Sequence, residues 1–172
     1  MITGRLDLPG RFCDELWLNH GRSNIHAPMA SKRKASKRGR QCAAFPFQIR
    51  DGETHVLLVT SRETKRWVLP KGWTEKRGGA RQAKQEAFEE AGIIGRIASK
   101  PIGAYAYPKR LDGGDTVTCD VEVYALAVDR LLDEWPEMAE RQRRWFTLPQ
   151  AAMAVEEGGL VTLMLQLAAP EA

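Results

Sequence analysis

The chain has 172 residues, a length typical of one domain, and a formal net charge of +4 at pH 7. Hydrophobic residues make up 43% of it and charged residues 28%, the balance of a folded globular protein. The three cysteines have no C-x-x-C spacing, which argues against a disulfide framework or a zinc site. No apolar stretch approaches the roughly eighteen residues of a membrane span. We therefore expect a cytoplasmic protein without a membrane partner.

The first part of the chain differs in composition from the rest. Residues 1–37 show little hydrophobic alternation, and the run SKRKASKRGR at 31–40 holds six basic residues and no acidic one. We predict a basic N-terminal appendage at residues 1–37 and a folded domain at 38–168. The basic run has three interpretations: a solvated linker, an arm that binds RNA or a membrane surface through phosphates, or a source of phosphate ligands at Arg38 and Arg40.

From residue 41 the pattern is that of strands followed by a helix. The segments CAAFPFQIR and HVLLVTS, separated by Asp51-Gly52, predict a β-hairpin. The sequence WVLP at 67–70 predicts a short strand. Residues 80–91 predict a helix with a stripe of small residues, and Gly92 suits the left-handed position after its last turn.

The remaining segments continue this mixture. RIASKPIGAYAYPK and DTVTCDVEVYALAVD have the Tyr, Val and Thr content of strands, and the residues from 111 to 115 between them resemble a turn. Residues 143–146 predict a further strand. Residues 148–157 and 160–167 predict two helices, which Gly158-Gly159 would separate. Periodicity alone therefore predicts one α+β domain.

The helix predicted at residues 80–91 carries three carboxylates. Glu86, Glu89 and Glu90 are three and four residues apart, so they project from neighbouring positions on one helix face. Like charges at this spacing repel, whereas a cluster of carboxylate oxygens suits Mg²⁺ or Mn²⁺. The spacing therefore indicates a helix built around a divalent cation.

The run KGWTEKRGGARQAKQEAFEEAGI resembles the signature of the Nudix hydrolases, in which a glycine-led loop precedes a helix with the pattern Arg-Glu-aliphatic-x-Glu-Glu-x-Gly-aliphatic. The second half of the signature agrees at Glu86, Glu89, Glu90 and at the glycine that follows. The first half departs from it: Gln85 replaces the family's arginine, and Arg77 or Gly78 stands in the place of an earlier loop glutamate. The flanks HVLLVTSRETKRWVLPKGW and LLDEWPEMAERQRRWFTLPQAA resemble the diphosphoinositol polyphosphate phosphohydrolase and dinucleoside polyphosphate hydrolase branch.

This resemblance implies an α/β fold with a mixed sheet, the Nudix α/β/α sandwich, and a Mg²⁺ or Mn²⁺ cofactor. It implies Glu86 and Glu90 as metal ligands, with a backbone carbonyl at Lys71 or Gly72 completing the set. Glu89 would accept a proton, although it could equally be a third ligand. Because Gln85 lacks a cation that orients a neighbouring carboxylate, we expect either a slow enzyme or a non-catalytic module that binds a polyphosphorylated ligand or RNA as a sensor.

The implied activity is cleavage of a phosphoanhydride in a polyphosphorylated small molecule. The candidate substrates are, in falling order, an inositol pyrophosphate, a dinucleoside polyphosphate such as a diadenosine polyphosphate, and capped or triphosphorylated RNA ends, so a nucleic-acid partner is less favoured. The sequence indicates no oligomeric state. Arginine suits bidentate phosphate binding, and the candidates for substrate contact, each of which could also be an ordinary surface residue, are Arg38, Arg40, Thr60, Ser61, Arg62, Arg141 and Arg143.

Three further residues have two interpretations each. Trp67 lies beside an apolar strand and we expect it in the core, whereas Trp73 in the following turn could pack or stack on a base. Glu122 lies in the strand VEVYAL, and alternation places it on the opposite face from Val121 and Val123. An acid there could be a further metal ligand.

Overall fold

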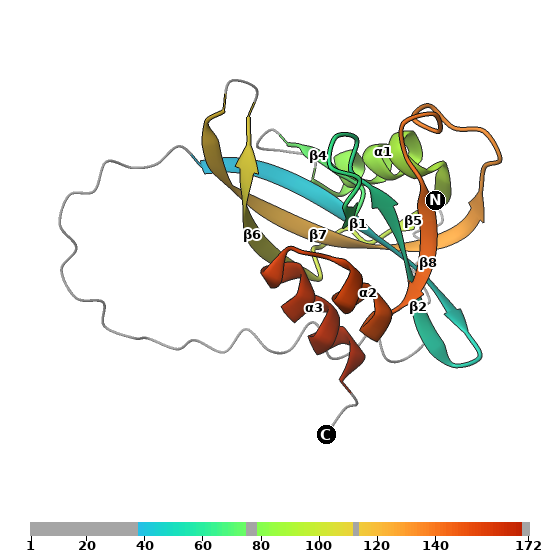
Figure 1. Cartoon of the computed structure of the whole chain (residues 1–172). Coiled ribbons are helices and arrows are strands. Elements are labelled where there is room, and N and C mark those ends of the chain that lie inside the picture. The colour runs from blue at the N-terminus through green and yellow to red at the C-terminus, as the bar shows by residue number, and fades with distance from the viewer. Residues whose placement is uncertain (1–37, 75–78, 112–113, 170–172) are drawn as a thin grey trace. The chain divides into compact units, whose positions relative to one another are not determined.

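The computed structural model describes residues 38–74, 79–111 and 114–169, and all of them belong to one compact unit. The appendage predicted at residues 1–37, and the departures from the signature at Arg77 and Gly78, lie outside these residues. Among the described residues, every helix is too short or too polar to cross a bilayer. The elements in chain order are β1 (Arg38–Arg50), β2 (Glu53–Thr60), β3 (Trp67–Val68), β4 (Lys71–Trp73), α1 (Gly79–Ala91), β5 (Ile93–Ile97), β6 (Gly103–Arg110), β7 (Thr116–Leu131), β8 (Arg143–Thr147), α2 (Leu148–Ala154) and α3 (Gly158–Ala168) (Figure 1).

The strands form one mixed sheet. Its central order is β3-β2-β1-β7-β5, with β4 paired to β1, β6 to β7 and β8 to β2. The long strands β1 and β7 run parallel, and the other named pairs are antiparallel. The parallel pair places Cys42 beside Glu122. Residues eighty apart in the sequence are thereby brought to one part of the sheet.

The predicted hairpin is confirmed. Residues 47–50 of β1 pair with residues 53–56 of β2, and the turn residues Asp51 and Gly52 have φ angles of 52° and 79°. Two consecutive positive φ angles are those of the turn that matches the right-handed twist of paired strands. Turn chemistry and hydrophobic alternation therefore agree here.

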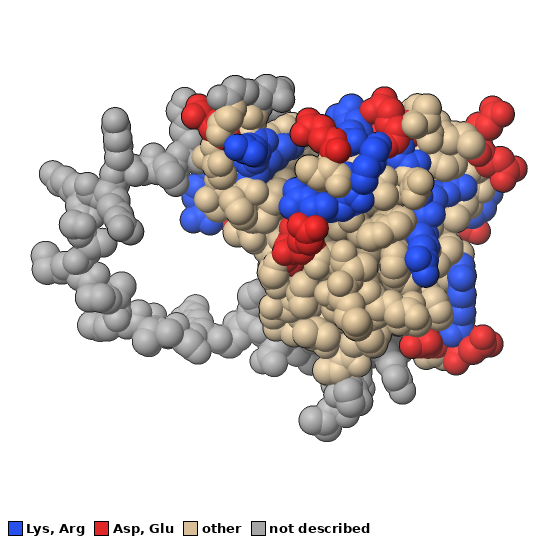
Figure 2. Space-filling model, viewed as in Figure 1, with Lys and Arg blue, Asp and Glu red and all other residues tan. Residues whose placement is uncertain are grey.

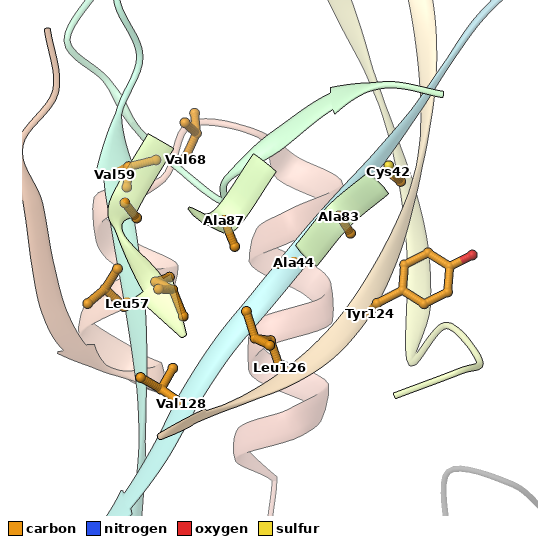
Figure 3. Close-up of a cluster of buried hydrophobic side chains, with 12 residues drawn as sticks. Cys42, Ala44, Leu57, Val59, Val68, Ala83, Ala87, Tyr124, Leu126 and Val128 are labelled. Carbon is orange, nitrogen blue, oxygen red and sulfur yellow. The ribbon is translucent and has the colours of Figure 1, made fainter. Parts of the chain in front are cut away.

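Helix α1 covers one face of the sheet. Ala83, Ala87 and Ala91 have no exposed surface and contact a cluster that includes Leu57 and Leu126 (Figure 3). The small side chains allow the helix backbone to lie close to the strands, and burying this apolar surface holds α1 against the sheet. Gly92 has a φ of +62°, the left-handed conformation predicted for the residue after α1.

Helices α2 and α3 cover the other face, so the domain is the predicted α/β/α sandwich (Figure 1). Leu160 and Met164 of α3 are fully buried against this face. The two helices contain no charged residue, and the surface over them in Figure 2 carries few charges compared with the upper part of the view.

The predicted bounds of these two helices were wrong. Helix α2 ends at Ala154 because the next residue, Val155, is extended and forms a β-bridge with Trp67. Helix α3 includes Gly158 and Gly159, which were predicted to separate the helices. An ideal Cβ on Gly159 would lie 2.7 Å from Tyr105 Cβ, so this glycine lets the first turn of α3 approach β6 closely.

Candidate active site

The three carboxylates of α1 have three different environments. Glu86 is half-buried and accepts a 2.6 Å hydrogen bond from Gln82 Nε2, one turn earlier in the helix. Glu89 is also half-buried and accepts a 2.6 Å hydrogen bond from Gln85 Nε2. Glu90 is buried, with 6% exposure. The helix therefore presents two carboxylates that water can reach and one that is held inside.

Glu86 lies against the backbone of β4. An ideal Cβ on Gly72 would lie 2.7 Å from Glu86 Oε2 and closer still to Oε1, whereas ordinary van der Waals contact begins near 3.4 Å. The carboxylate can occupy this position only because residue 72 has no side chain. Gly72 pairs with Cys42 of β1, so this contact is on the face of the sheet that α1 covers.

Glu90 meets β4 one residue earlier and also meets an arginine. Glu90 Oε2 accepts a 3.2 Å hydrogen bond from the Lys71 N–H, and Glu90 Oε1 accepts one from the Arg141 guanidinium. Burial raises the pKa of Glu90 to about 7, and the charge of Arg141 and the Lys71 N–H oppose this rise without cancelling it. Burial and pairing thus act in opposite directions on one carboxylate.

This arrangement fits a divalent cation held between α1 and β4. Glu86 and Glu90 reach consecutive β4 residues, Gly72 and Lys71, so two carboxylates lie against one short piece of backbone. Among the described residues, no three acidic, His or Cys side chains come close enough to form a complete metal site. Mg²⁺ is usually held by one or two carboxylates together with waters and substrate phosphates, so two carboxylates suit it.

Lys71 has two separate roles in the structure. Its N–H contacts Glu90, but its side chain points to the opposite face, where Nζ lies 3.1 Å from Glu157 Oε1. Burial lowers the pKa of the Lys71 ammonium, and Glu157 opposes this shift. A metal contact from residue 71 would therefore involve its main chain, as predicted from the sequence.

Two of the predicted substrate arginines do not line an open rim. Arg141 is 9% exposed, and its three donor groups contact Glu90, Glu137 Oε2 and the Thr60 carbonyl. Arg143 donates to two carbonyls and lies over the Trp135 ring, with 4.0 Å from its Cζ to the ring centroid. Both guanidiniums are engaged in holding the fold, because each satisfies acceptors from separate segments of the chain.

Thr60 and Ser61 also have local structural partners. Thr60 is buried, and its hydroxyl accepts a 2.9 Å hydrogen bond from the Gln142 N–H. The Ser61 hydroxyl lies 2.7 Å from Thr64 Oγ1 and accepts from the Arg66 N–H, which closes the turn after β2. These contacts explain both residues without a ligand.

The other three predicted substrate residues are exposed cations with acidic partners. Arg38 forms a two-point contact with Asp120, at 2.8 and 2.6 Å. Arg40 lies 3.6 Å from Glu122, and Arg62 lies 3.8 Å from both Glu137 and Glu140. The register of β1 and β7 pairs residue 38 with 118 and residue 40 with 120, so all four β1 and β7 charges lie near one end of the sheet.

Sequence reasoning considered Glu122 but missed what surrounds it. Tyr124 donates a 2.9 Å hydrogen bond to Glu122 Oε2, so the two side chains share the α1 face, away from Val121 and Val123 as predicted. Cys42 lies in the same region: burial, together with the charges of Glu86 and Glu122, raises the pKa of its thiol to about 11. The parallel pairing that brings these groups together leaves no local sequence signal.

The two tryptophans also differ in position. Trp67, which was predicted to lie in the core, is only partly buried and packs edge to face on Phe146, with 5.1 Å between ring centroids. Trp73 is 48% exposed, and Lys109 Nζ lies 4.4 Å from its ring centroid. Trp73 pairs with Gln41 and thus faces away from α1, on the other side of β4 from the Glu86 contact.

The curated proteins similar to this chain include Nudix hydrolases. No family model matches the chain. The chain is 34% identical over 104 residues to "Nudix hydrolase 12, mitochondrial" of Arabidopsis thaliana, an alignment that covers 56% of this chain and 49% of that protein. It is 33% identical over 113 residues to "Diphosphoinositol polyphosphate phosphohydrolase 3-alpha" of Homo sapiens, covering 60% of this chain and 62% of that protein. The chain spans about half the length of several of the curated relatives that it matches.

Solved structures share the fold at low sequence identity. A Caenorhabditis elegans Ap4A hydrolase superposes with a TM-score of 0.57 at 15% identity, covering 77% of this chain and 97% of that one. The NUDIX domain of Shewanella oneidensis NrtR, solved with ADP ribose, superposes with a TM-score of 0.56 at 14% identity and covers 77% of this chain and 90% of that one. The curated relatives include Nudix hydrolases, and the solved structures, one of them a NUDIX domain, share the fold, which agrees with the resemblance seen in the sequence.

Proposed function

We propose that this protein is a metal-dependent pyrophosphohydrolase that cleaves a phosphoanhydride bond in a polyphosphorylated small molecule. One observation carries the proposal: Glu86 and Glu90 of α1 reach consecutive residues of β4, Gly72 and Lys71. Two carboxylates fixed against one piece of backbone can bind a hard cation, and Glu86, the partly exposed one, can be reached from solvent. The Nudix relatives support the same reaction class.

The residues divide the work as follows. Glu86 and Glu90 would hold Mg²⁺ or Mn²⁺ with a main-chain carbonyl of residue 71 or 72. A bound ion of this kind supplies charge neutralisation of the diphosphate and a lower pKa for a bound water. Glu89, which is half-buried and accepts a hydrogen bond from Gln85, would accept a proton from an attacking water. Arg38, Arg40 and Arg62 are exposed cations that would contact the substrate phosphates.

The substrate candidates come from the names of the relatives. The human relative named diphosphoinositol polyphosphate phosphohydrolase and the structural neighbour named Ap4A hydrolase support an inositol pyrophosphate or a diadenosine polyphosphate as candidates. A cytoplasmic location remains our expectation, although some relatives carry the word mitochondrial in their names.

The test is product release from a panel of substrates. Diadenosine polyphosphates, an inositol pyrophosphate, nucleoside triphosphates and 5′-triphosphorylated RNA are incubated with Mg²⁺ or Mn²⁺, with and without chelator. A Glu86→Gln protein purified in the same way controls for contaminating hydrolases. Chelator-sensitive release from one substrate by the wild type, and loss of that release in the variant, supports the proposal. Metal-dependent binding of a ligand without turnover of any panel member would instead indicate a sensor.

A further inference from the structure

The segment between β7 and β8 holds the end of α1. An α-helix leaves its last carbonyls without partners inside the helix. Here four consecutive carbonyls, those of residues 89, 90, 91 and 92, all accept hydrogen bonds from residues 132–143, the connection together with the first residue of β8, which we call the clamp segment. The donors, in the same order, are the Glu137 N–H at 3.1 Å, the Trp135 indole N–H at 3.1 Å, the Arg143 guanidinium at 2.6 Å and the Leu132 N–H at 2.9 Å.

The clamp segment also contacts a carboxylate side chain of the helix. Arg141 donates to Glu90 Oε1, and both side chains are 7% exposed. The same guanidinium donates to Glu137 Oε2 at 2.5 Å and to the Thr60 carbonyl at 2.9 Å. One planar group therefore ties α1, the clamp segment and the end of β2 together. Because its donors point in fixed directions, the group sets the orientation of the carboxylate that it binds.

The partners of the three α1 carboxylates differ in kind. Glu86 and Glu89 accept hydrogen bonds from neutral glutamines of their own helix, Gln82 and Gln85. Glu90 accepts from a cation on another element and from the Lys71 N–H of β4. Each of its oxygens has a donor, and each carboxylate oxygen keeps a second lone pair that can bind a cation. Glu90 is thus the carboxylate whose orientation is most closely determined.

We propose that Arg141 is the positioning residue for Glu90, which it holds in the orientation needed to bind the metal against β4. This inference rests on the proposed function, because it takes Glu90 as a metal ligand. In this inference Arg141 orients a metal ligand and does not contact the substrate, as the sequence suggested that it would. Partners of this kind typically change metal affinity by about 10- to 100-fold when they are altered.

The first test compares two substitutions at the same guanidinium. Arg141→Lys keeps the charge but removes the planar fork. Glu137→Gln keeps Arg141 and its contact with Glu90 but removes the ion pair with Glu137. Binding of Mn²⁺ is measured by electron paramagnetic resonance, and the melting temperature by circular dichroism. We expect both variants to melt at lower temperature than the wild type, and only Arg141→Lys to raise the Mn²⁺ dissociation constant, by about 10- to 100-fold.

The second test uses the wild-type chain, so it holds even if Arg141→Lys does not fold. Mn²⁺ is paramagnetic and broadens the NMR signals of nearby protons. We expect saturating Mn²⁺ to broaden the Arg141 Nε–H signal beyond detection and to leave that of Arg50, in the β1–β2 hairpin, sharp.

The outcomes separate the inference from the proposed function. If the wild type binds no Mn²⁺, the proposed function fails. If the wild type binds Mn²⁺ but Arg141→Lys binds it equally well, or Glu137→Gln weakens it as much, Arg141 is only a structural residue. Mn²⁺ binding that leaves the Arg141 signal sharp would place the metal elsewhere and overturn the inference as well.

Discussion

Gly72 gives the most direct test of the candidate metal site. Substituting alanine would place a Cβ 2.7 Å from Glu86 Oε2 and closer to Oε1, against an ordinary contact distance of about 3.4 Å. The Glu86 carboxylate must therefore move by more than about 0.7 Å. The φ angle of Gly72 is not positive, so alanine adds no backbone strain of that kind. The effect should fall on the position of Glu86 and hardly on the fold.

The size of the effect follows from this displacement. A misplacement of about 1 Å at a reacting centre can cost about 10²-fold in rate. We expect Gly72→Ala to lower kcat/KM for the best panel substrate about 100-fold and to weaken Mn²⁺ binding, while the unfolding free energy changes by less than about 1 kcal/mol because Glu86 is half-exposed and can swing into solvent.

The matched control is Gly158→Ala. Gly158 opens α3, and a Cβ there meets nothing within 4 Å. Initial rates, Mn²⁺ titration and thermal melting are measured for both variants. If Gly72→Ala keeps wild-type rate and metal affinity within about two-fold, the carboxylate against β4 is not part of a metal site and the reasoning fails.

Four further predictions concern other parts of the site. Glu90→Gln should lower metal-dependent turnover by orders of magnitude. It should also lower the melting temperature, because it leaves the buried Arg141 without a charged partner. Unchanged turnover would show that Glu90 is not a metal ligand. Without metal, the unfolding free energy of the wild type minus that of Glu90→Gln should fall by up to about 3 kcal/mol as pH rises from about 4.5 to 7, measured by urea unfolding. The reason is that a carboxyl whose pKa is raised to about 7 binds more protons when folded than when unfolded. A rise over this range would show that the charge of Arg141 has more effect on the pKa of Glu90 than burial has. Removing residues 1–36 should leave turnover intact, whereas Arg38→Ala and Arg40→Ala should each raise KM about tenfold, the equivalent of one charge-assisted hydrogen bond; equal behaviour of all three would make the basic run a linker. Gly92→Ala should lower the unfolding free energy by about 1–2 kcal/mol in urea titration, because φ is +62° and a Cβ would lie 2.9 Å from Trp135 Cβ.

Local features of the fold could be predicted, because their physical causes lie in neighbouring residues. Asp51-Gly52 sets the hairpin turn, and the alanine stripe of α1 with Gly92 after it sets the helix and its end. The end of α2 could not be predicted, since it depends on a bridge between Val155 and Trp67. The spacing of the acids in α1 likewise gave their helix face but not their environments.

The environments of the site residues also depend on contacts between residues that are far apart in the sequence. Arg141 and Glu90 are 51 positions apart, and Arg143 contacts Ala91 across 52 positions. No pattern of composition distinguishes these arginines from Arg38 or Arg62, because an arginine in an Arg-rich strand is compatible with a surface, a substrate contact or a buried pair. Only the path of the clamp segment over α1 decides which of these applies.

The number of arginines that can contact phosphate affects which substrate we expect. The many arginines of the sequence suit either a highly phosphorylated inositol or a dinucleoside polyphosphate. Arg141 is not available to bind phosphate, because breaking its buried ion pair with Glu90 costs about 3–5 kcal/mol. Arg143 is likewise engaged with two carbonyls of the fold.

The exposed cations remain available. The pairs of Arg38 with Asp120 and of Arg40 with Glu122 are surface ion pairs, and such pairs are worth only about 0–1 kcal/mol. A ligand phosphate can therefore displace these acids at little cost. Because Arg141 and Arg143 are engaged in the fold and acids lie beside Arg38 and Arg40, we expect the described surface near β1 and β7 to bind a phosphate chain of moderate charge better than a ring of many phosphates. We therefore expect the dinucleoside polyphosphate to be the better substrate of the two, and the relative kcat/KM of the two panel substrates tests this expectation.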